Sequence, residues 1–182
     1  MKTTPLLGFA AWSGAGKTTL LKALLPLLRA QNLSIAMIKH AHHEFDIDVP
    51  GKDSYELRKA GANQMLVCSS RRWALMVEAA TEREPKLADM LRHLPRENAD
   101  LILVEGLKNE PMDKIEIHRP ALNKPLLCAD DPHIIAVASD TPLTLPRGLP
   151  LLPLNEPAVI ADFILHRFKL GKHAMKTASK SS

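Results

Sequence analysis

The stretch AWSGAGKTTL, residues 11–20, decides how the rest of the sequence is interpreted. It ends the phosphate-binding pattern G-x-x-x-x-G-K-[ST] with an intact G-K-T triplet, but Ala11 stands where the first glycine belongs. Gly14 and Gly16 allow backbone N–H groups to approach phosphate oxygens without obstruction by side chains. Alanine is the smallest departure from glycine, so we expect the loop to keep its phosphate-binding role.

The segments on both sides of this loop are those that a phosphate loop requires. Residues 6–10 form an apolar run typical of a buried strand, and residues 17–29 carry leucines on one helical face. Lys17 is then placed to supply positive charge to the outer phosphates, and the Thr18 hydroxyl to bind Mg²⁺. The predicted nucleotide-binding residues of the loop are Ser13, Gly14, Ala15, Gly16, Lys17, Thr18 and Thr19.

Strand-like and helical patterns alternate along the remaining chain. The predicted strands are 34–39, 64–68, 73–77, 100–106, 114–117 and 134–138, with the second and third joined as a hairpin. The predicted helices are 54–60 behind a capping box at Asp53 and Glu56, 86–94, and one capped by Asn155 that ends near residue 170. This order predicts an α/β fold with a mostly parallel sheet flanked by helices, and ligand chemistry at the carboxyl ends of its strands.

Acidic residues follow several of the predicted strands. Glu105 ends the apolar strand DLILVE, where a carboxylate opposite Lys17 holds Mg²⁺ directly or through water. Asp46 and Asp48, in the loop after residues 34–39, are either further Mg²⁺ ligands or solvated loop residues. Asp140 follows IIAVAS, where it either accepts hydrogen bonds from a guanine edge or starts a turn.

Two other motifs leave their function open. Asn123 and Lys124 begin the guanine-reading pattern N-K-x-D, but Leu126 occupies the place of its aspartate, so GTP is not established by this motif. His40, His42 and His43 fit no defined zinc spacing, and polar contacts to phosphate, substrate or a partner explain them as well as a metal does. Trp12, inside the phosphate loop, is interpreted as a packing residue or a contact to the nucleotide edge.

Composition and charge limit the class of protein. The chain has 182 residues, a net charge of +4 and a pI of about 9.1, but five basic residues and no acid lie in 167–182. The rest of the chain therefore has a net charge of −1. We expect a single nucleotide-binding domain over residues 1–170 and a basic, disordered tail over 171–182, with no nucleic-acid partner.

Cysteine content and hydropathy point to an intracellular protein. No apolar run approaches the roughly 20 residues that span a bilayer, which predicts a cytoplasmic protein with no membrane partner. Cys68 and Cys128 have no metal-type spacing, and we expect both to be small buried apolar residues.

Five segments together resemble one known family. They are FAAWSGAGKTTLL (9–21), IKHAHHEFDIDVPGKDSYELRKAGA (38–62), RWAL (72–75), DLILVEGLK (100–108) and IIAVASD (134–140). Over residues 6–165 the chain resembles the molybdopterin-guanine dinucleotide biosynthesis protein B (MobB) family, and the His/Asp loop is far more specific than the phosphate loop. The resemblance implies a P-loop NTPase fold of the deviant GTPase type related to dethiobiotin synthetase. It also assigns the phosphate-loop roles to residues 14–19 and the role of strand-end acid to Glu105.

The same resemblance implies a function. It indicates a dimeric protein that binds GTP and Mg²⁺, hydrolyses GTP weakly, and assists the guanylyltransferase MobA in converting molybdopterin to molybdopterin guanine dinucleotide. Lys17 and Glu105 are the predicted catalytic residues, and Thr18, Glu105 and Asp48 the predicted metal ligands. No residue is identified that positions the attacking water.

Two alternatives remain open at this stage. A small-molecule kinase or ligase would use ATP, with the His/Asp loop and Arg58 binding an acidic substrate. A scaffold would bind nucleotide only to fix its shape. A polar surface around His42, His43, Lys52 and Arg58 is a further hypothesis, as the seat of an anionic pterin phosphate.

Overall fold

The chain folds into two compact units in a computed structural model that describes residues 4–41, 45–81 and 83–171. The larger unit contains Met1–His40 and Lys86–Ser182, and the smaller contains Ala41–Pro85. The single domain expected over residues 1–170 stays a prediction. His42 and His43 lie outside the described residues, as does the tail after residue 171.

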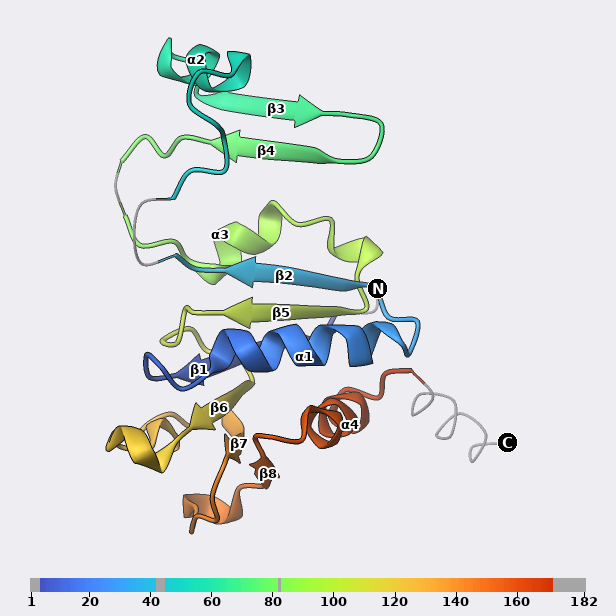
Figure 1. Ribbon diagram of the computed structural model, residues 1–182, viewed down its shortest axis with the longest axis vertical. Coiled ribbons are helices and arrows are strands. Elements are labelled where there is room, and N and C mark those ends of the chain that lie inside the picture. Colours follow the sequence, from blue (N-terminus) through green and yellow to red (C-terminus); the bar gives the residue numbers. More distant parts are fainter. Residues whose placement is uncertain (1–3, 42–44, 82, 172–182) are drawn as a thin grey trace. The chain divides into compact units, whose positions relative to one another are not determined.

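The larger unit is built on a six-stranded sheet in the order β2-β5-β1-β6-β7-β8, in which every neighbouring pair is parallel (Figure 1). Its strands are β1 (Leu6–Ala11), β2 (Ile35–Lys39), β5 (Leu101–Glu105), β6 (Lys114–His118), β7 (Ile134–Ser139) and β8 (Leu151–Pro153). Every residue of β5 is buried, as expected of a parallel strand covered on both faces. The predicted α/β class with a mostly parallel sheet is confirmed.

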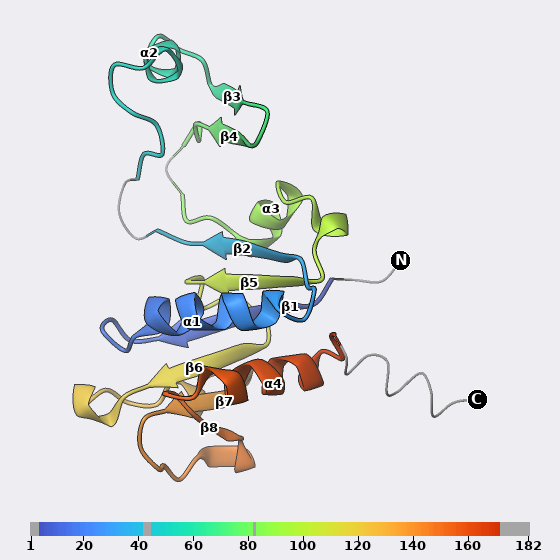
Figure 2. The same ribbon diagram turned by 45° about the vertical axis from the view of Figure 1, so that its right-hand side comes forward.

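Helices α1 (Lys17–Arg29) and α4 (Pro157–Arg167) pack together beside this sheet (Figure 2). Leu7 and Phe9 of β1 share one apolar cluster with Leu24 of α1 and Ile160 of α4. Each such side chain contributes about 1.5–3 kcal/mol when it is fully buried. This cluster fixes α1, and with it the phosphate loop, to the central strand.

The opposite face of the sheet has a second core. Ile102 and Val104 of β5 pack there with Leu87 of helix α3 (Leu87–Arg92) and with Met112, while their neighbours in β5 face the first cluster. Between β5 and β7 the chain crosses this face without an α-helix. Residues 106–133, all of them described, carry only the 3₁₀ turns η2 (Pro120–Leu122) and η3 (Leu127–Ala129) outside β6.

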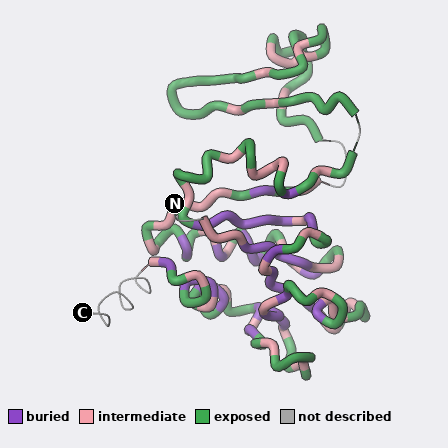
Figure 3. Tube along the Cα trace, turned by 180° about the vertical axis from the view of Figure 1, so that it is seen from behind, coloured by how far each residue is buried: buried purple, intermediate pink, exposed green. Residues whose placement is uncertain are grey.

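The smaller unit consists of helix α2 (Asp53–Lys59) and a hairpin of β3 (Gln64–Cys68) and β4 (Trp73–Val77). The strands are antiparallel, with Gln64 opposite Val77 and Cys68 opposite Trp73, so the predicted hairpin and its bounds are confirmed. Exposed residues dominate this unit, whereas buried residues gather in the sheet of the larger one (Figure 3).

Three local predictions are wrong. Helix α2 begins at Asp53 after Lys52, without a side-chain capping bond, so Asp53 lies in the first turn and the capping box does not form. The residue before α4 is Glu156 rather than Asn155, because the chain turns helical at Pro157. Cys128 is buried as expected, but Cys68 is exposed at the end of β3.

The remaining short elements are two 3₁₀ turns, η1 (Arg96–Asn98) and η4 (Pro146–Gly148). Among the described residues, no helix has the length and apolar character needed to cross a bilayer.

Candidate functional site

The phosphate loop joins the central strand β1 to α1, and its backbone has the conformation that the glycines allow. Gly14 has φ of 82° and Gly16 has φ of 93°, a left-handed region that strains other residues. Gly16 is the residue before α1, and α1 has neither a side-chain cap nor an acid in its first turn. The first N–H groups of this 13-residue helix therefore have no side chain competing with an anion.

The alanine in place of the first glycine has a structural explanation. Ala11 is the last residue of β1 and pairs with Ile117 of β6. It is not among the residues with positive φ, so the position needs no glycine. The left-handed turns occur later, at Gly14 and Gly16, where the glycines are retained.

The Thr18 hydroxyl and the Glu105 carboxylate are brought together next to this loop. The Thr18 Oγ1 donates to Glu105 Oε1 over 3.4 Å, and Lys39 Nζ lies 3.4 Å from Glu105 Oε2. Glu105 is buried at the carboxyl end of β5. Two adjacent oxygen groups of this kind suit Mg²⁺, which prefers oxygen ligands and keeps several waters.

Gly106 gives Glu105 its place at the strand end. It has φ of 91°, and a Cβ at this position would lie 2.7 Å from the Cβ of His40. Only glycine permits both the turn and this approach to the end of β2.

Arg119 is a residue of the site that the sequence analysis missed. It follows β6, and its Nε donates to the carbonyl oxygen of Ala15 in the phosphate loop over 3.1 Å. Its Nη1 donates to Asp140 Oδ2 over 2.5 Å. The arginine therefore ties the residue predicted to read the base to the loop predicted to bind phosphate. Its place at the carboxyl end of a central strand was the signal that could have identified it.

The interrupted N-K-x-D pattern has another role. Leu126, in the place of the aspartate, is half-buried against Cys128 and Val137. Lys124 places its Nζ 5.7 Å from the centroid of the Trp12 ring, and Lys108 does the same at 5.3 Å. Trp12 itself donates from Nε1 to the carbonyl oxygen of Pro125 over 2.8 Å, which fixes its indole.

The acids of the His/Asp loop surround Arg58 within the smaller unit. Arg58 donates to both carboxylate oxygens of Asp46 at 2.8 Å, to Asp48 at 3.3 Å and to Glu78 at 2.6 Å. Asp48 also accepts from the Ser54 hydroxyl over 2.9 Å. The Mg²⁺ role of Asp48 stays a prediction.

The hydrogen bonds and charges of this cluster shift the pKa values of Asp46 and Arg58. The pKa of Asp46 is lowered, first by a hydrogen bond from the backbone N–H of Asp48 and then by Arg58. The pKa of Arg58 is raised by its hydrogen bonds to Asp46 and Glu78. The charge of Arg58 is therefore matched by carboxylates of its own unit.

No group of three or more His, Cys, Asp or Glu residues is arranged to hold a metal in residues 4–41, 45–81 and 83–171. The metal hypothesis for the histidines depends on His42 and His43, which are outside this set. His40 takes part in contacts next to Gly106.

Comparison with protein families identifies a match over residues 6–140 to the model "Molybdopterin guanine dinucleotide synthesis protein B" (MobB). A protein of Escherichia coli K12 named molybdopterin-guanine dinucleotide biosynthesis adapter protein is 51% identical over 162 residues. This similarity covers 88% of the chain and 91% of that protein. A protein of the same name from Haemophilus influenzae is 42% identical over 167 residues, or 90% of the chain and 91% of that protein.

Solved structures show the same fold. A crystal structure of molybdopterin-guanine biosynthesis protein B has a TM-score of 0.70 and 25% identity, and covers 91% of the chain and 99% of that protein. The MobB structure from Bacillus subtilis has a TM-score of 0.68 at 24% identity, and covers 90% and 97%. At 24% identity, the similarity to the Bacillus subtilis protein shows the fold alone.

Proposed function

The chain belongs to the molybdopterin guanine dinucleotide synthesis protein B (MobB) family, and from this premise we propose that it is a GTP-binding adapter protein of molybdopterin guanine dinucleotide synthesis. It assists the guanylyltransferase MobA in converting molybdopterin to the guanine dinucleotide, and it acts in the cytoplasm. The names of the relatives at 51% and 42% identity support the adapter role.

One observation carries the nucleotide-binding part of the proposal. The left-handed Gly14 and Gly16 lead directly into an uncapped helix, with Lys17 in its first turn. Thr18 and Glu105 lie 3.4 Å apart beside it. These are the elements that hold a nucleoside triphosphate and its Mg²⁺ in P-loop proteins. Asp140, tied to the loop by Arg119, is the proposed acceptor for the guanine edge.

The proposed reaction is slow hydrolysis of GTP by in-line attack of water on the γ-phosphate. Lys17 and the N–H groups of the loop stabilise the negative charge on the phosphate oxygens in the transition state. Mg²⁺, when bound, would supply positive charge that offsets the negative charge of the triphosphate. Thr18 and Glu105 are the residues that would hold it. Among the described residues no group is assigned to position the water, and we therefore expect low turnover without a partner.

A homodimer is part of the proposal. The β3–β4 hairpin exposes Leu66, Val67, Trp73, Leu75 and Val77. A two-stranded hairpin is marginally stable in water, and apolar residues at this density are typical of an interaction surface. A second copy of the chain is the proposed partner for this hairpin.

The contacts of Arg58 argue against the alternative of a small-molecule kinase or ligase, in which Arg58 would bind the acidic substrate. Arg58 is paired with Asp46, Asp48 and Glu78, so its charge is engaged before any acidic substrate arrives. The same contacts argue against Arg58 as the seat of a pterin phosphate.

The test is calorimetric titration with GTP and ATP, with and without Mg²⁺, using the wild-type protein, Lys17→Ala and Lys22→Ala. Lys22 is exposed on the same helix and serves as the matched control. We expect Mg²⁺-dependent binding that favours GTP, is abolished by Lys17→Ala and is kept by Lys22→Ala. Equal or tighter binding of ATP would contradict the guanine assignment.

The adapter role needs a second measurement. Wild-type protein should associate with MobA and increase its formation of the guanine dinucleotide. If Lys17→Ala does so equally well, nucleotide binding is not required and the scaffold alternative is correct.

A further inference from the structure

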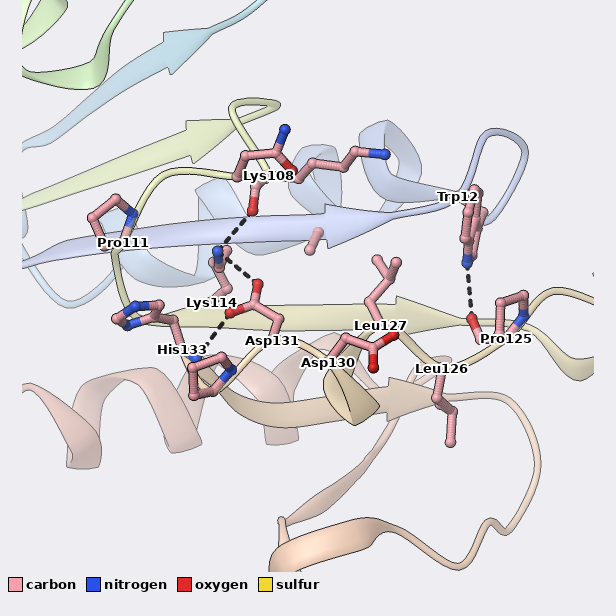
Figure 4. Close-up of a pocket in the computed structure, with 13 residues that line it drawn as sticks. Trp12, Lys108, Pro111, Lys114, Pro125, Leu126, Leu127, Asp130, Asp131 and His133 are labelled. Atoms are coloured by element: carbon pink, nitrogen blue, oxygen red, sulfur yellow. Dashed lines mark hydrogen bonds and ion pairs between the residues drawn. The ribbon is translucent and has the colours of Figure 1, made fainter.

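A cavity of about 470 Å³ lies on the sheet face that is crossed by loops, within the larger unit (Figure 4). It is lined by residues of the β5–β6 and β6–β7 connections and by Ala10 and Trp12 at the end of β1. This volume falls in the range of small-molecule sites, which runs from roughly 300 to 1,000 Å³. None of the predicted phosphate-binding residues lines it.

A buried lysine holds the walls of the cavity in place. Lys114 is almost completely buried and donates from Nζ to the carbonyl oxygens of Lys108 and Glu110, at 2.7 and 2.9 Å. The same Nζ lies 2.7 Å from Asp131 Oδ2. It therefore links the two connections that face each other across the cavity. A Cβ at Gly8 would lie 2.7 Å from Cγ of Lys114, so the glycine makes room for this side chain.

The end of the cavity near the phosphate loop is positively charged and rigid. The Trp12 indole is held by its hydrogen bond to Pro125, and the Nζ atoms of Lys108 and Lys124 lie within 6 Å of its centroid. Both lysines are exposed. Lys108 lines the cavity and offers an ammonium group to a phosphate there, whereas Lys124 approaches the same ring without lining the cavity.

The middle of the cavity combines an apolar wall with one carboxylate. Leu126 and Leu127 lie there near Asp130 and provide a surface against which a planar ring packs, whereas Pro111 and Pro125 line opposite ends (Figure 4). Asp130 also lines it, and its carboxylate has no hydrogen bond or ion pair within the described residues. Asp131, in contrast, is engaged by Lys114.

We propose that this cavity binds a phosphorylated 2-amino-4-oxopyrimidine ring system, with the heterocycle against Leu126 and Leu127 beside Asp130 and its phosphate on Lys108. The amino group and the adjacent ring N–H donate in parallel to the two oxygens of Asp130, a charge-assisted pair. A pterin phosphate and a guanine nucleotide share this chemistry. The inference rests on the proposed function, which makes the phosphopterin the occupant, since the guanine nucleotide has the phosphate loop.

The experiment measures binding of 6-hydroxymethylpterin monophosphate and of GMP to the full chain carrying Trp73→Phe. Trp12 is then the sole tryptophan and reports on the cavity by fluorescence, with calorimetry as the second readout. We expect the phosphopterin to bind more tightly than GMP, and Lys17→Ala to leave its affinity unchanged.

The variants locate the site. Asp130→Asn should weaken phosphopterin binding at least about tenfold, because it removes one charged hydrogen-bonding group. Lys108→Glu should weaken it to a similar degree, more at low than at high salt. Asp162→Asn and Lys22→Glu are the matched controls, exposed on α4 and α1, and should bind as the unmodified chain does.

Three results would overturn the inference. Unchanged affinity in both Asp130→Asn and Lys108→Glu would remove the cavity as the site. Loss of binding in Lys17→Ala would place the ligand in the phosphate loop. Tighter binding of GMP than of the phosphopterin would reject the pterin. Each result leaves the proposed function intact if Mg²⁺-dependent GTP binding and association with MobA persist.

Discussion

At the scale of single residues, Arg119 has the most informative position. Its guanidinium contacts a phosphate-loop carbonyl and the Asp140 carboxylate at the same time. An arginine can do this because its N–H groups diverge in a fixed plane, whereas a lysine offers one ammonium. Arg119 is therefore expected to position two parts of the nucleotide site rather than to contact only one.

Replacing Arg119 with methionine should weaken GTP binding about tenfold, because the loop and Asp140 each lose a charged partner. Lys should restore part of the affinity, since it keeps the charge but cannot make both contacts. The measurement is calorimetric titration with GTP. Arg29→Met, exposed at the end of α1, is the matched control. An Arg119→Met variant that binds GTP with wild-type affinity would show that the contacts of Arg119 with Ala15 and Asp140 have no role in GTP binding.

The two thiols should differ in reactivity. Burial, together with the charge of Glu116, raises the pKa of the Cys128 thiol to about 11, whereas Cys68 is exposed. We expect a thiol reagent at pH 8 to modify Cys68 rapidly and Cys128 only after unfolding. Because the folded state holds the proton more tightly, the contribution of Cys128 to stability is complete below about pH 9 and declines as pH rises towards 11. Cys68→Ser should leave no rapidly reacting thiol; a remaining fast phase would contradict the assignment.

At the scale of secondary-structure elements, the β3–β4 hairpin leaves most of its apolar side chains exposed. Leu66 and Leu75 are cross-strand partners, and both are exposed. We expect the double variant Leu66→Ser/Leu75→Ser to shift the protein from dimer to monomer in analytical ultracentrifugation. The physical reason is the loss of apolar area that a partner would bury.

The control for this change is Val159→Ser, which removes an exposed apolar side chain from α4. It should leave the sedimentation of the dimer unchanged. If the hairpin variant still forms a dimer with an unchanged dissociation constant, the dimer interface lies elsewhere on the protein.

Elements with strong local patterns were predictable from the sequence. The leucine face of α1 and the unbroken apolar run of β5 each specify one element, and the observed bounds agree with the predicted ones to within one or two residues. The hairpin was also predictable, because two apolar segments flank a short polar turn. The pairing of Thr18 with Glu105 followed from placing loop and strand end at the same edge of the sheet.

Features that depend on distant residues were not predictable. Helix α2 begins at Asp53 instead of being capped by it, since Asp46 and Asp48 with Arg58 fix the chain before it. The pairing of Arg119 with Ala15 joins residues 104 positions apart, which no local pattern encodes. The cavity arises for the same reason, because two connections without helices face each other over β6.

At the scale of the whole molecule, each compact unit contains one of the two tryptophans. Trp12 lies in the larger unit and Trp73 in the smaller. Their indole N–H signals in NMR spectra therefore report on the two units separately.

The smaller unit should be the more sensitive to acid. The lowered pKa of Asp46 means that its ion pair with Arg58 stabilises the unit fully above its ordinary pKa of 3.8. This contribution is lost as pH falls through the lower folded value. We expect the Trp73 signal to change in that range before the Trp12 signal does, and Asp46→Asn to remove the difference. If the Trp73 and Trp12 signals of the wild-type protein change together, the smaller unit is not the more sensitive to acid.

The central place of β1 has a consequence for how the protein is made. Leu6 pairs with Ile102 and Ala11 with Ile117, so β1 has no partner in the sheet until the strands that contain these residues have been synthesised. At typical synthesis rates this wait lasts on the order of 5 to 20 s. During that time helix α2 and the β3–β4 hairpin leave the ribosome, before the sheet partners of β1 do. Chaperones therefore have the most to protect while β1 and the phosphate loop that follows it are synthesised but β1 is still unpaired.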